Sequence, residues 1–346
     1  MNDRMIISNA DQTGLYRDAA TGESRSVWGI FAETGTGVDG LFTAEEVIAK
    51  ADLGWKVTLD RVMNGRTRRV IPGRFCVTRE DNGAHFGEVS SSYVPWQNID
   101  AIEWLDRLVG EKVISYSTAG YWDNGKTVWL LVDIQRQFEP LPGDQVKLYL
   151  LVSFGHGGSA AARIGLQPIR VVCGNTHRAA VDNIREGAYA AKSLAIRHSG
   201  NMEKRLEKGM ELIRGQINLI AGWQDEVAAM VNEAFNEEEA EQAVIDIVQA
   251  ASVERGTQER VTTIGELNYR QAPIALKMTE LLYSGKGMDI PGVKGTGWQV
   301  FNAATEWVDH YSNEDANARA MYSMFGRGSL IKDYASRIAT RQLSLA

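Results

Sequence analysis

The chain has 346 residues, with 37 lysines and arginines against 44 aspartates and glutamates, and its formal net charge is −7. This length fits one large domain or two domains of moderate size. Hydrophobic residues make up 44% of the chain and charged residues 23%, which is typical of a globular protein and excludes an intrinsically disordered one. Taken as a single sum, the acidic charge also argues against a nucleic-acid partner.

Cysteine content and hydropathy indicate the compartment. The two cysteines, Cys76 and Cys173, are too few for a disulfide framework and favour a reducing environment. The polar N-terminus is not followed by the apolar segment of a signal peptide, and no run of about 18 apolar residues is present to span a membrane. We therefore expect a cytoplasmic protein without a membrane partner.

The first half of the chain predicts strands joined by tight turns. Residues 1–25 are polar and rich in Gly, Asp and Ser, so we expect a flexible arm. A capping box at residues 43–46 begins a short helix. Residues 55–60 alternate between apolar and polar, as in a half-buried strand, and the pair Asn64-Gly65 predicts a tight hairpin turn. Two further strands and a helix follow, at 70–78, at 84–90 and from Gln97 onward.

The pattern then restarts, and it ends in helices. Strands are predicted at 113–117, 128–134, 146–154 and 168–173, and Asn175 is placed to cap a helix that begins at Thr176. The turns are too short for crossover helices, so most neighbouring strands must be antiparallel. Beyond these strands the apolar spacing is helical, over 176–196, 201–232, 237–255, 263–284, 298–311 and 315–343.

We therefore predict an α+β fold. Its N-terminal part is a mostly antiparallel sheet with helices, built as two rounds of strands followed by a helix, and its C-terminal part is all helical. The expected domains are a flexible arm at 1–25, an α+β core at 26–196 and a helical domain at 197–346.

Charge is segregated along the chain. Residues 61–79 hold six arginines and no acidic residue, whereas residues 225–259 hold ten acidic residues and one arginine. Two further segments, 192–214 and 319–341, are basic on balance. The arginine-rich hairpin is either an edge strand protected by charge or a contact for nucleic-acid phosphates, which the guanidinium fork suits. The acidic segment is either a solvated helix face or a contact for a basic neighbour, including another copy of this chain.

Two more sites allow a functional and a structural interpretation. A predicted strand ends where a predicted helix starts, at Asn175 and Thr176, with Arg170 and Arg178 nearby. This segment either binds an anion such as phosphate at the helix start or only caps the helix. Tyr121 and Trp122 lie beside a turn and are either stacking platforms for bases or core residues. The five histidines show no metal-binding spacing, and no glycine-rich loop has the phosphate-binding ending, so we expect neither a metal nor a cofactor.

Three polar boxes resemble one known family. They are 91–98 (Ser-Ser-Tyr-Val-Pro-Trp-Gln-Asn), 168–176 (Pro-Ile-Arg-Val-Val-Cys-Gly-Asn-Thr) and 297–310, which contains Asn-Ala-Ala-Thr-Glu-Trp-Val-Asp-His. In this order they resemble the boxes of a phage and plasmid protein family named domain of unknown function 932, with Trp307 where a tyrosine is expected. The resemblance implies a mobile-element origin and a bacterial cytoplasm. The layout is also distantly similar to phage single-strand annealing proteins, which form oligomeric rings or filaments.

The main hypothesis is a phage-encoded protein that binds and anneals single-stranded DNA in recombination. It would need no ATP or other cofactor and would act as a homo-oligomer, a ring or a filament. The expected DNA contacts are Arg61, Arg66, Arg68, Arg69, Arg74, Arg79, Arg170, Arg178, Tyr121 and Trp122.

Two alternatives stay open. The first is an enzyme of unknown reaction that uses the polar boxes. The second is an anti-defence protein that binds a host protein through its acidic helices. The candidate participants of the enzyme are Asn98, His156, Asn175, His177, Glu306, Asp309 and His310.

Overall fold

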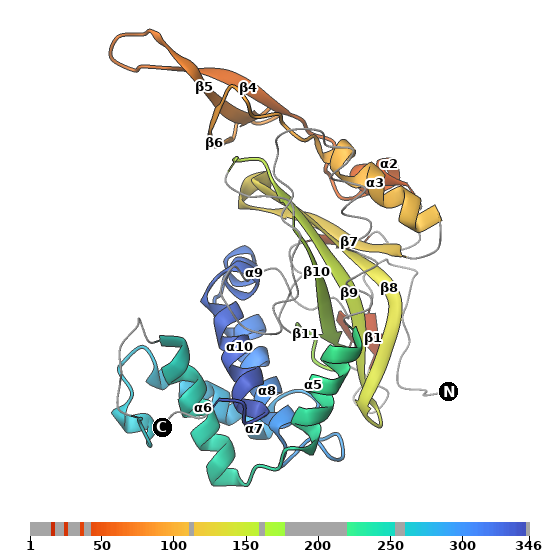
Figure 1. Ribbon diagram of the computed structural model, residues 1–346, viewed down its shortest axis with the longest axis vertical. Coiled ribbons are helices and arrows are strands. Elements are labelled where there is room, and N and C mark those ends of the chain that lie inside the picture. Colours follow the sequence, from red (N-terminus) through yellow and green to blue (C-terminus); the bar gives the residue numbers. More distant parts are fainter. Residues whose placement is uncertain are drawn as a thin grey trace.

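The computed structural model describes residues 15–17, 24–26, 35–37, 43–110, 114–158, 163–176, 220–252 and 260–343. It confirms the α+β fold: antiparallel sheets with helices come first and a run of helices follows (Figure 1). The expected helices at 176–196 and over 201–219 lie outside the described residues, apart from Thr176 itself. The expected flexible arm does so too, except that β1 (Leu15–Arg17) pairs with β2 (Ser24–Ser26).

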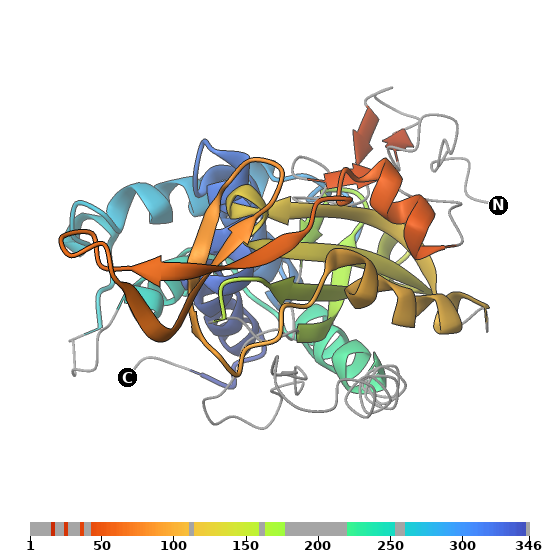
Figure 2. The ribbon, with the colours of Figure 1, turned by 90° about the horizontal axis from the view of Figure 1, so that it is seen from above.

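A small antiparallel sheet projects from the body of the protein. The strands β4 (Val57–Met63), β5 (Val70–Arg79) and β6 (His85–Ser90) pair in that order. Residues of β4 and β5 are buried near the body and exposed toward the tip of their hairpin. Figure 1 shows this hairpin at the opposite end of the long axis from the C-terminal helices, and Figure 2 shows it reaching beyond the strands of the larger sheet.

The hairpin turn differs from the predicted two-residue Asn64-Gly65 turn. The connection runs over residues 64–69, and the Asn64 side chain accepts hydrogen bonds from the backbone N–H groups of Arg66 and Thr67. Within this loop the left-handed backbone conformation is adopted by Arg68, with φ of 56°. An Asx turn built by one side chain therefore replaces the expected tight turn.

The larger sheet has six antiparallel strands, in the order β11-β10-β9-β8-β7-β3. Both faces are covered. Trp129, Leu131 and Tyr149 pack in one cluster with residues of a C-terminal helix, and the alternate residues belong to the larger core. This explains the continuous apolar runs in β8 and β9, because a strand covered on both faces has no polar side. The strands are β3 (Gly35–Gly37), β7 (Ser115–Trp122), β8 (Thr127–Leu141), β9 (Asp144–Gly155), β10 (Arg163–Arg170) and β11 (Asn175–Thr176).

Helices pack on both sides of this sheet (Figure 1). The short helix α2 (Ala44–Lys50) begins with the predicted capping box: Thr43 Oγ1 accepts from the N–H of Glu46, and the Glu46 carboxylate accepts from the N–H of Thr43. It packs with α3 (Asn98–Gly110) on one side. The C-terminal helices are α5 (Ile220–Asn232), α6 (Glu237–Ser252), α7 (Ala272–Ser284), α8 (Gly297–Glu306), α9 (Ala316–Phe325) and α10 (Arg327–Ala339). Of these, α9 packs on the opposite face, beside Trp129 and Leu131, whereas α5 contacts Phe138 of β8 through Trp223.

Three of the predicted C-terminal helices are interrupted. Pro273 lies in the first turn of α7, where its missing N–H costs nothing, so the helix starts there rather than at 263. The segment 298–311 changes from α8 into the π-helical turn η3 (Trp307–Tyr311), and Gly326 separates α9 from α10. Among the described residues, no helix combines the length and the apolar character needed to cross a membrane.

Close packing at the start of α8 yields the first prediction. A Cβ atom added to Gly297 would overlap the carbonyl oxygen of Ala339 at the end of α10. Gly297→Ala is therefore expected to lower the free energy of unfolding by about 1–3 kcal/mol, measured by urea denaturation. The matched control is Gly222→Ala in α5, where an added Cβ meets no atom within 4 Å; this change should be neutral or slightly stabilising. Equal stability of the two variants would contradict the packing of α8 against α10.

Candidate functional site

The β4–β5 hairpin, residues 57–79, carries five exposed arginines and is called the arginine hairpin below. Arg74 pairs with Glu88 at 3.3 Å, and the other four arginines form no ion pair with any described residue. Three apolar side chains, Met63, Val70 and Ile71, are exposed beside them by 52%, 45% and 38%. The exposed arginines are Arg61, Arg66, Arg68, Arg69 and Arg74.

The sixth arginine of this segment, Arg79, is not available to a ligand. It is 4% exposed, and its guanidinium forms a two-pronged ion pair with Asp81 at 2.7 and 2.9 Å. The same group lies 4.3 Å from the centre of the Trp55 ring and 5.2 Å from that of Tyr121. The prediction of a DNA contact at Arg79 is therefore wrong. Arg79 joins the base of the hairpin to the six-stranded sheet through cation–π contacts.

The polar side chains of the first box hold this base in place. The Gln97 side chain donates to the carbonyl of Val57 and accepts from its N–H, both at 3.0 Å, as a neighbouring strand would. Asn98 Nδ2 donates to the Leu53 carbonyl, and Asn98 Oδ1 lies 2.9 Å from His156 Nε2. Tyr93 donates to the carbonyl of His156. This box therefore connects α3, the start of β4 and the end of β9.

The two candidate stacking residues differ in position. Trp122 is fully buried and stacks on Trp129 at a ring distance of 5.2 Å, so the prediction that it stacks on bases is wrong. It lies beside the turn, as predicted, but it is the last residue of β7, and its side chain points into the cluster with α9. Tyr121 is half-buried and faces Trp55 and Arg79. It thus belongs to the support of the hairpin.

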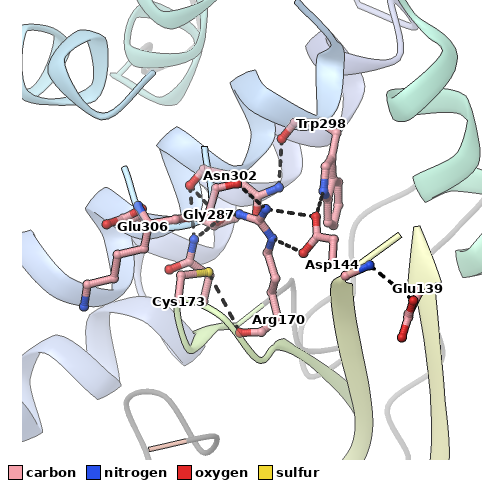
Figure 3. A network of polar contacts seen from close by, with 12 residues as sticks. Glu139, Asp144, Arg170, Cys173, Gly287, Trp298, Asn302 and Glu306 are labelled. Carbon is pink, nitrogen blue, oxygen red and sulfur yellow. Dashed lines mark hydrogen bonds and ion pairs between the residues drawn. The ribbon is translucent and has the colours of Figure 1, made fainter. Parts of the chain in front are cut away.

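Arg170 is also buried, and it contacts a carboxylate of its own chain. Its guanidinium donates to both oxygens of Asp144, at 2.6 and 2.9 Å, and both side chains are fully buried. Figure 3 shows Trp298 donating to the same carboxylate, at 2.8 Å, and the Arg170 guanidinium reaching the carbonyls of Lys286 and Gly287. The expected phosphate contact at Arg170 is therefore wrong, because Asp144 already occupies the position of the anion.

The anion-binding helix start predicted at Asn175 and Thr176 is likewise wrong. The two residues form strand β11, antiparallel to the end of β10, and both are fully buried. The backbone N–H and the hydroxyl of Thr176 donate to one oxygen of Asp309, at 2.6 and 2.7 Å. The amide nitrogen of Asn175 donates to the carbonyl of Asn302. The expected contact at Arg178 lies outside the described residues.

The Asp309 carboxylate is the centre of a second buried charge pair. Its other oxygen accepts from Lys332 at 2.7 Å and from Ser323 at 2.6 Å, and Lys332 and Asp309 are both fully buried. Lys332 also donates to the hydroxyl of Thr176. The second and third boxes thus meet at the junction of the sheet with α8, η3 and α10.

Cys173 is buried beside this junction and is not poised as a nucleophile. Burial raises the pKa of its thiol to about 12, so the thiol stays protonated at neutral pH. Glu306, almost fully buried, accepts from the backbone N–H of Lys286 and fixes the loop after α7 (Figure 3). These groups are engaged in structure, and none of them faces an exposed surface.

The candidate enzyme residues do not form one site. Asn98 and His156 lie just beyond one end of β9, and Asn175, Glu306 and Asp309 lie near Asp144 at the other. Strand β9 spans 12 residues, so the two groups are roughly 35 Å apart along it. His310 neighbours the second group, and His177 lies outside the described residues.

Sequence reasoning missed two buried charged residues and one side-chain pair. Lys332 lies in a segment that is basic on balance, and Asp144 follows the turn between β8 and β9, so the sequence has no signal of burial at either position. Cys76 Sγ lies 2.5 Å from His85 Nδ1 across β5 and β6, a contact that only the strand register produces. Among the described residues, no group of three or more His, Cys, Asp or Glu side chains could hold a metal ion.

Comparison with known proteins identifies the family. The model of a family described as domain of unknown function (DUF932) matches residues 85–337. The chain belongs to the DUF932 family. All three polar boxes lie inside the match, whereas the arginine hairpin precedes it. No curated protein and no solved structure matches this DUF932 chain.

The buried ion pair yields the second prediction. Arg170→Met leaves the Asp144 charge buried with the Trp298 indole as its remaining side-chain donor in Figure 3. The free energy of unfolding should fall by about 3–5 kcal/mol, measured by urea denaturation. Adding Asp144→Asn removes the charge and keeps an acceptor for Trp298, so the double variant should recover part of this loss. A single variant as stable as the parent would show that the pair is not buried in solution.

His310 yields a prediction on pH. Burial lowers the pKa of His310 to about 4, and its Nε2 atom has no hydrogen-bond partner among the described residues. As pH falls, His310 is therefore protonated near pH 6.5 in the unfolded chain but only near pH 4 in the folded chain. Stability is expected to fall by up to about 3 kcal/mol as pH drops through this window, measured by urea denaturation at each pH. His310→Gln should remove that part of the slope, and a variant that keeps the full slope would contradict the burial of His310.

Proposed function

We propose that this protein binds the backbone of single-stranded DNA through the arginine hairpin. One observation carries the proposal: the β4–β5 hairpin projects from the body of the protein with five exposed arginines, four of which have no acidic partner among the described residues, and beyond β6 it is a two-stranded ribbon. An isolated ribbon buries little apolar surface and is barely stable by itself. Edge protection needs far fewer charges than this hairpin carries, so a ligand rich in phosphates explains its composition better.

The chemistry is electrostatic capture. Guanidinium groups bind phosphate oxygens in a forked geometry and release the counterions condensed on the strand. The exposed Met63, Val70 and Ile71 lie among the arginines and offer apolar surface to bases. A strand held mainly by its phosphates keeps the pairing edges of its bases accessible to a complementary strand. This mode of binding supports annealing without a nucleotide cofactor.

The rest of the chain would serve as a rigid mount for the hairpin. Arg79, Gln97 and Asn98 fix the hairpin base to α3 and to the six-stranded sheet. Several copies bound side by side along one strand would then each present their arginines to it and multiply weak contacts. A role in the recombination of a phage or another mobile element, inside the bacterial cytoplasm, fits this chemistry.

The experiment replaces Arg66, Arg68 and Arg69 by Ala and measures the affinity for a single-stranded oligonucleotide by fluorescence anisotropy over a series of salt concentrations. Each lost phosphate contact on a single strand should reduce the salt slope by about 0.7, so the slope should fall by about 2. The affinity at low salt should fall at least about tenfold.

The matched control removes three exposed positive charges elsewhere, by replacing Lys50, Lys294 and Arg337 with Ala. It changes the net charge equally and should leave the slope unchanged. Equal effects of the two triple variants would mean that binding is diffuse, and an unchanged affinity in the hairpin variant would refute the proposal. The enzyme and the host-protein inhibitor stay predictions, and no described geometry favours either.

A further inference from the structure

The end of the protein opposite the arginine hairpin carries an acidic and aromatic surface. Glu237, Glu238 and Glu241 of α6 are exposed and form no ion pair with any described residue. Tyr283 of α7 is 43% exposed and donates to the Glu241 carboxylate at 2.8 Å, and Leu276, two helical turns earlier, is 58% exposed. These five side chains are called the α6–α7 face below.

The α6–α7 face and the hairpin tip are complementary in two respects. The face has three carboxylates that form no ion pair with any described residue, beside Leu276 and Tyr283, and the tip has Arg66, Arg68 and Arg69 beside Met63, Val70 and Ile71. Such a match of charge and of apolar surface is what a specific contact requires.

The two surfaces of one molecule do not meet. The hairpin lies at one end of the long axis and α6 and α7 at the other, with the six-stranded sheet between them (Figure 1). Arg79 and the first box fix the hairpin base, which prevents the hairpin from folding back over that distance. A contact between the two surfaces therefore requires two copies of the chain.

We propose that the hairpin tip of one molecule docks on the α6–α7 face of a second copy of this chain. Because the two surfaces differ, the contact is heterologous, and each molecule keeps one free tip and one free face. Repetition produces a head-to-tail filament or, if the rotation closes, a ring. Exposed charge pairs depend on salt, so the assembly should weaken as ionic strength rises.

One consequence rests on the proposed function. If the hairpin also binds DNA phosphates, the carboxylates of the face compete for the same arginines. A single strand would then loosen the contact between copies, and a copy without DNA would keep its hairpin covered.

The experiment is a charge swap, with mass measured by sedimentation at low salt. The hairpin variant carries R66E, R68E and R69E, and the face variant carries E237K, E238K and E241K. The parent should associate, and each variant alone should associate at least about tenfold more weakly, because like charges then meet at every contact. An equal mixture should associate again, since each tip meets a face of opposite charge.

The mixture also guards against misfolding, because a misfolded variant cannot restore association. Glu237 and Glu238 lie in the first turn of α6, where their charge favours the helix start, so the neutral variant E237Q/E238Q/E241Q provides a gentler test of the same face. It should also weaken association. A control with Glu103, Asp289 and Glu314 changed to Lys, all exposed elsewhere, should associate like the parent.

The outcomes separate this proposal from DNA binding. A face variant that no longer associates but binds an oligonucleotide at least as tightly as the parent supports both. Association that follows the charge swap in a chain that ignores DNA supports the docking and refutes the proposed function. A parent that stays monomeric at low salt, or a mixture that does not reassociate, overturns the docking.

Discussion

The fold depends on charges that are buried where the six-stranded sheet meets the C-terminal helices. Asp144 begins β9 and accepts from Arg170 of β10 and from Trp298 of α8, and all three side chains are fully buried. A buried ion pair of this kind adds little net stability compared with apolar residues of the same volume, but a misaligned one is costly. The pair therefore specifies how α8 packs on the sheet, because only one position lets the Trp298 indole reach the carboxylate.

A second pair secures the same joint a few residues away. Asp309 lies in the π-helical turn η3, and the extra residue of that turn re-aims the side chains that follow α8. Its carboxylate accepts hydrogen bonds from Thr176 of β11 and from Lys332 of α10, so one acidic group links η3 to the sheet and to α10. Both pairs use residues of the second and third family boxes. The polar residues of these two boxes therefore serve to assemble the core.

The net charge of the chain does not describe the charges that its surface exposes. Arg79, Arg170 and Lys332 are buried and neutralised within the chain, and Arg341 pairs with Glu233 and Glu239. Among the described residues, the arginine hairpin carries four exposed arginines without an ion pair, and α6 carries three exposed glutamates without one. The net charge of −7 describes neither surface. This separation supports contacts with a polyanion and between copies alike.

Local patterns in the sequence determine much of the protein. The capping box of α2, the alternation of β4 and the apolar runs of β8 and β9 predict their elements, because neighbours along the chain create those signals. The six arginines between 61 and 79 likewise mark the hairpin. Tertiary structure decides which arginines stay free: Arg79 contacts Trp55 and Asp81, whereas the Arg66 side chain is exposed and forms no ion pair with any described residue. The local sequence at Asn175 and Thr176 predicts a helix cap, but the two residues pair with β10. Their buried hydrogen bonds to Asn302 and Asp309 outweigh the local preference for a helix start. The sequence determines which charged residues the chain contains. Only the packing of distant segments determines which of them are neutralised in the interior and which remain exposed.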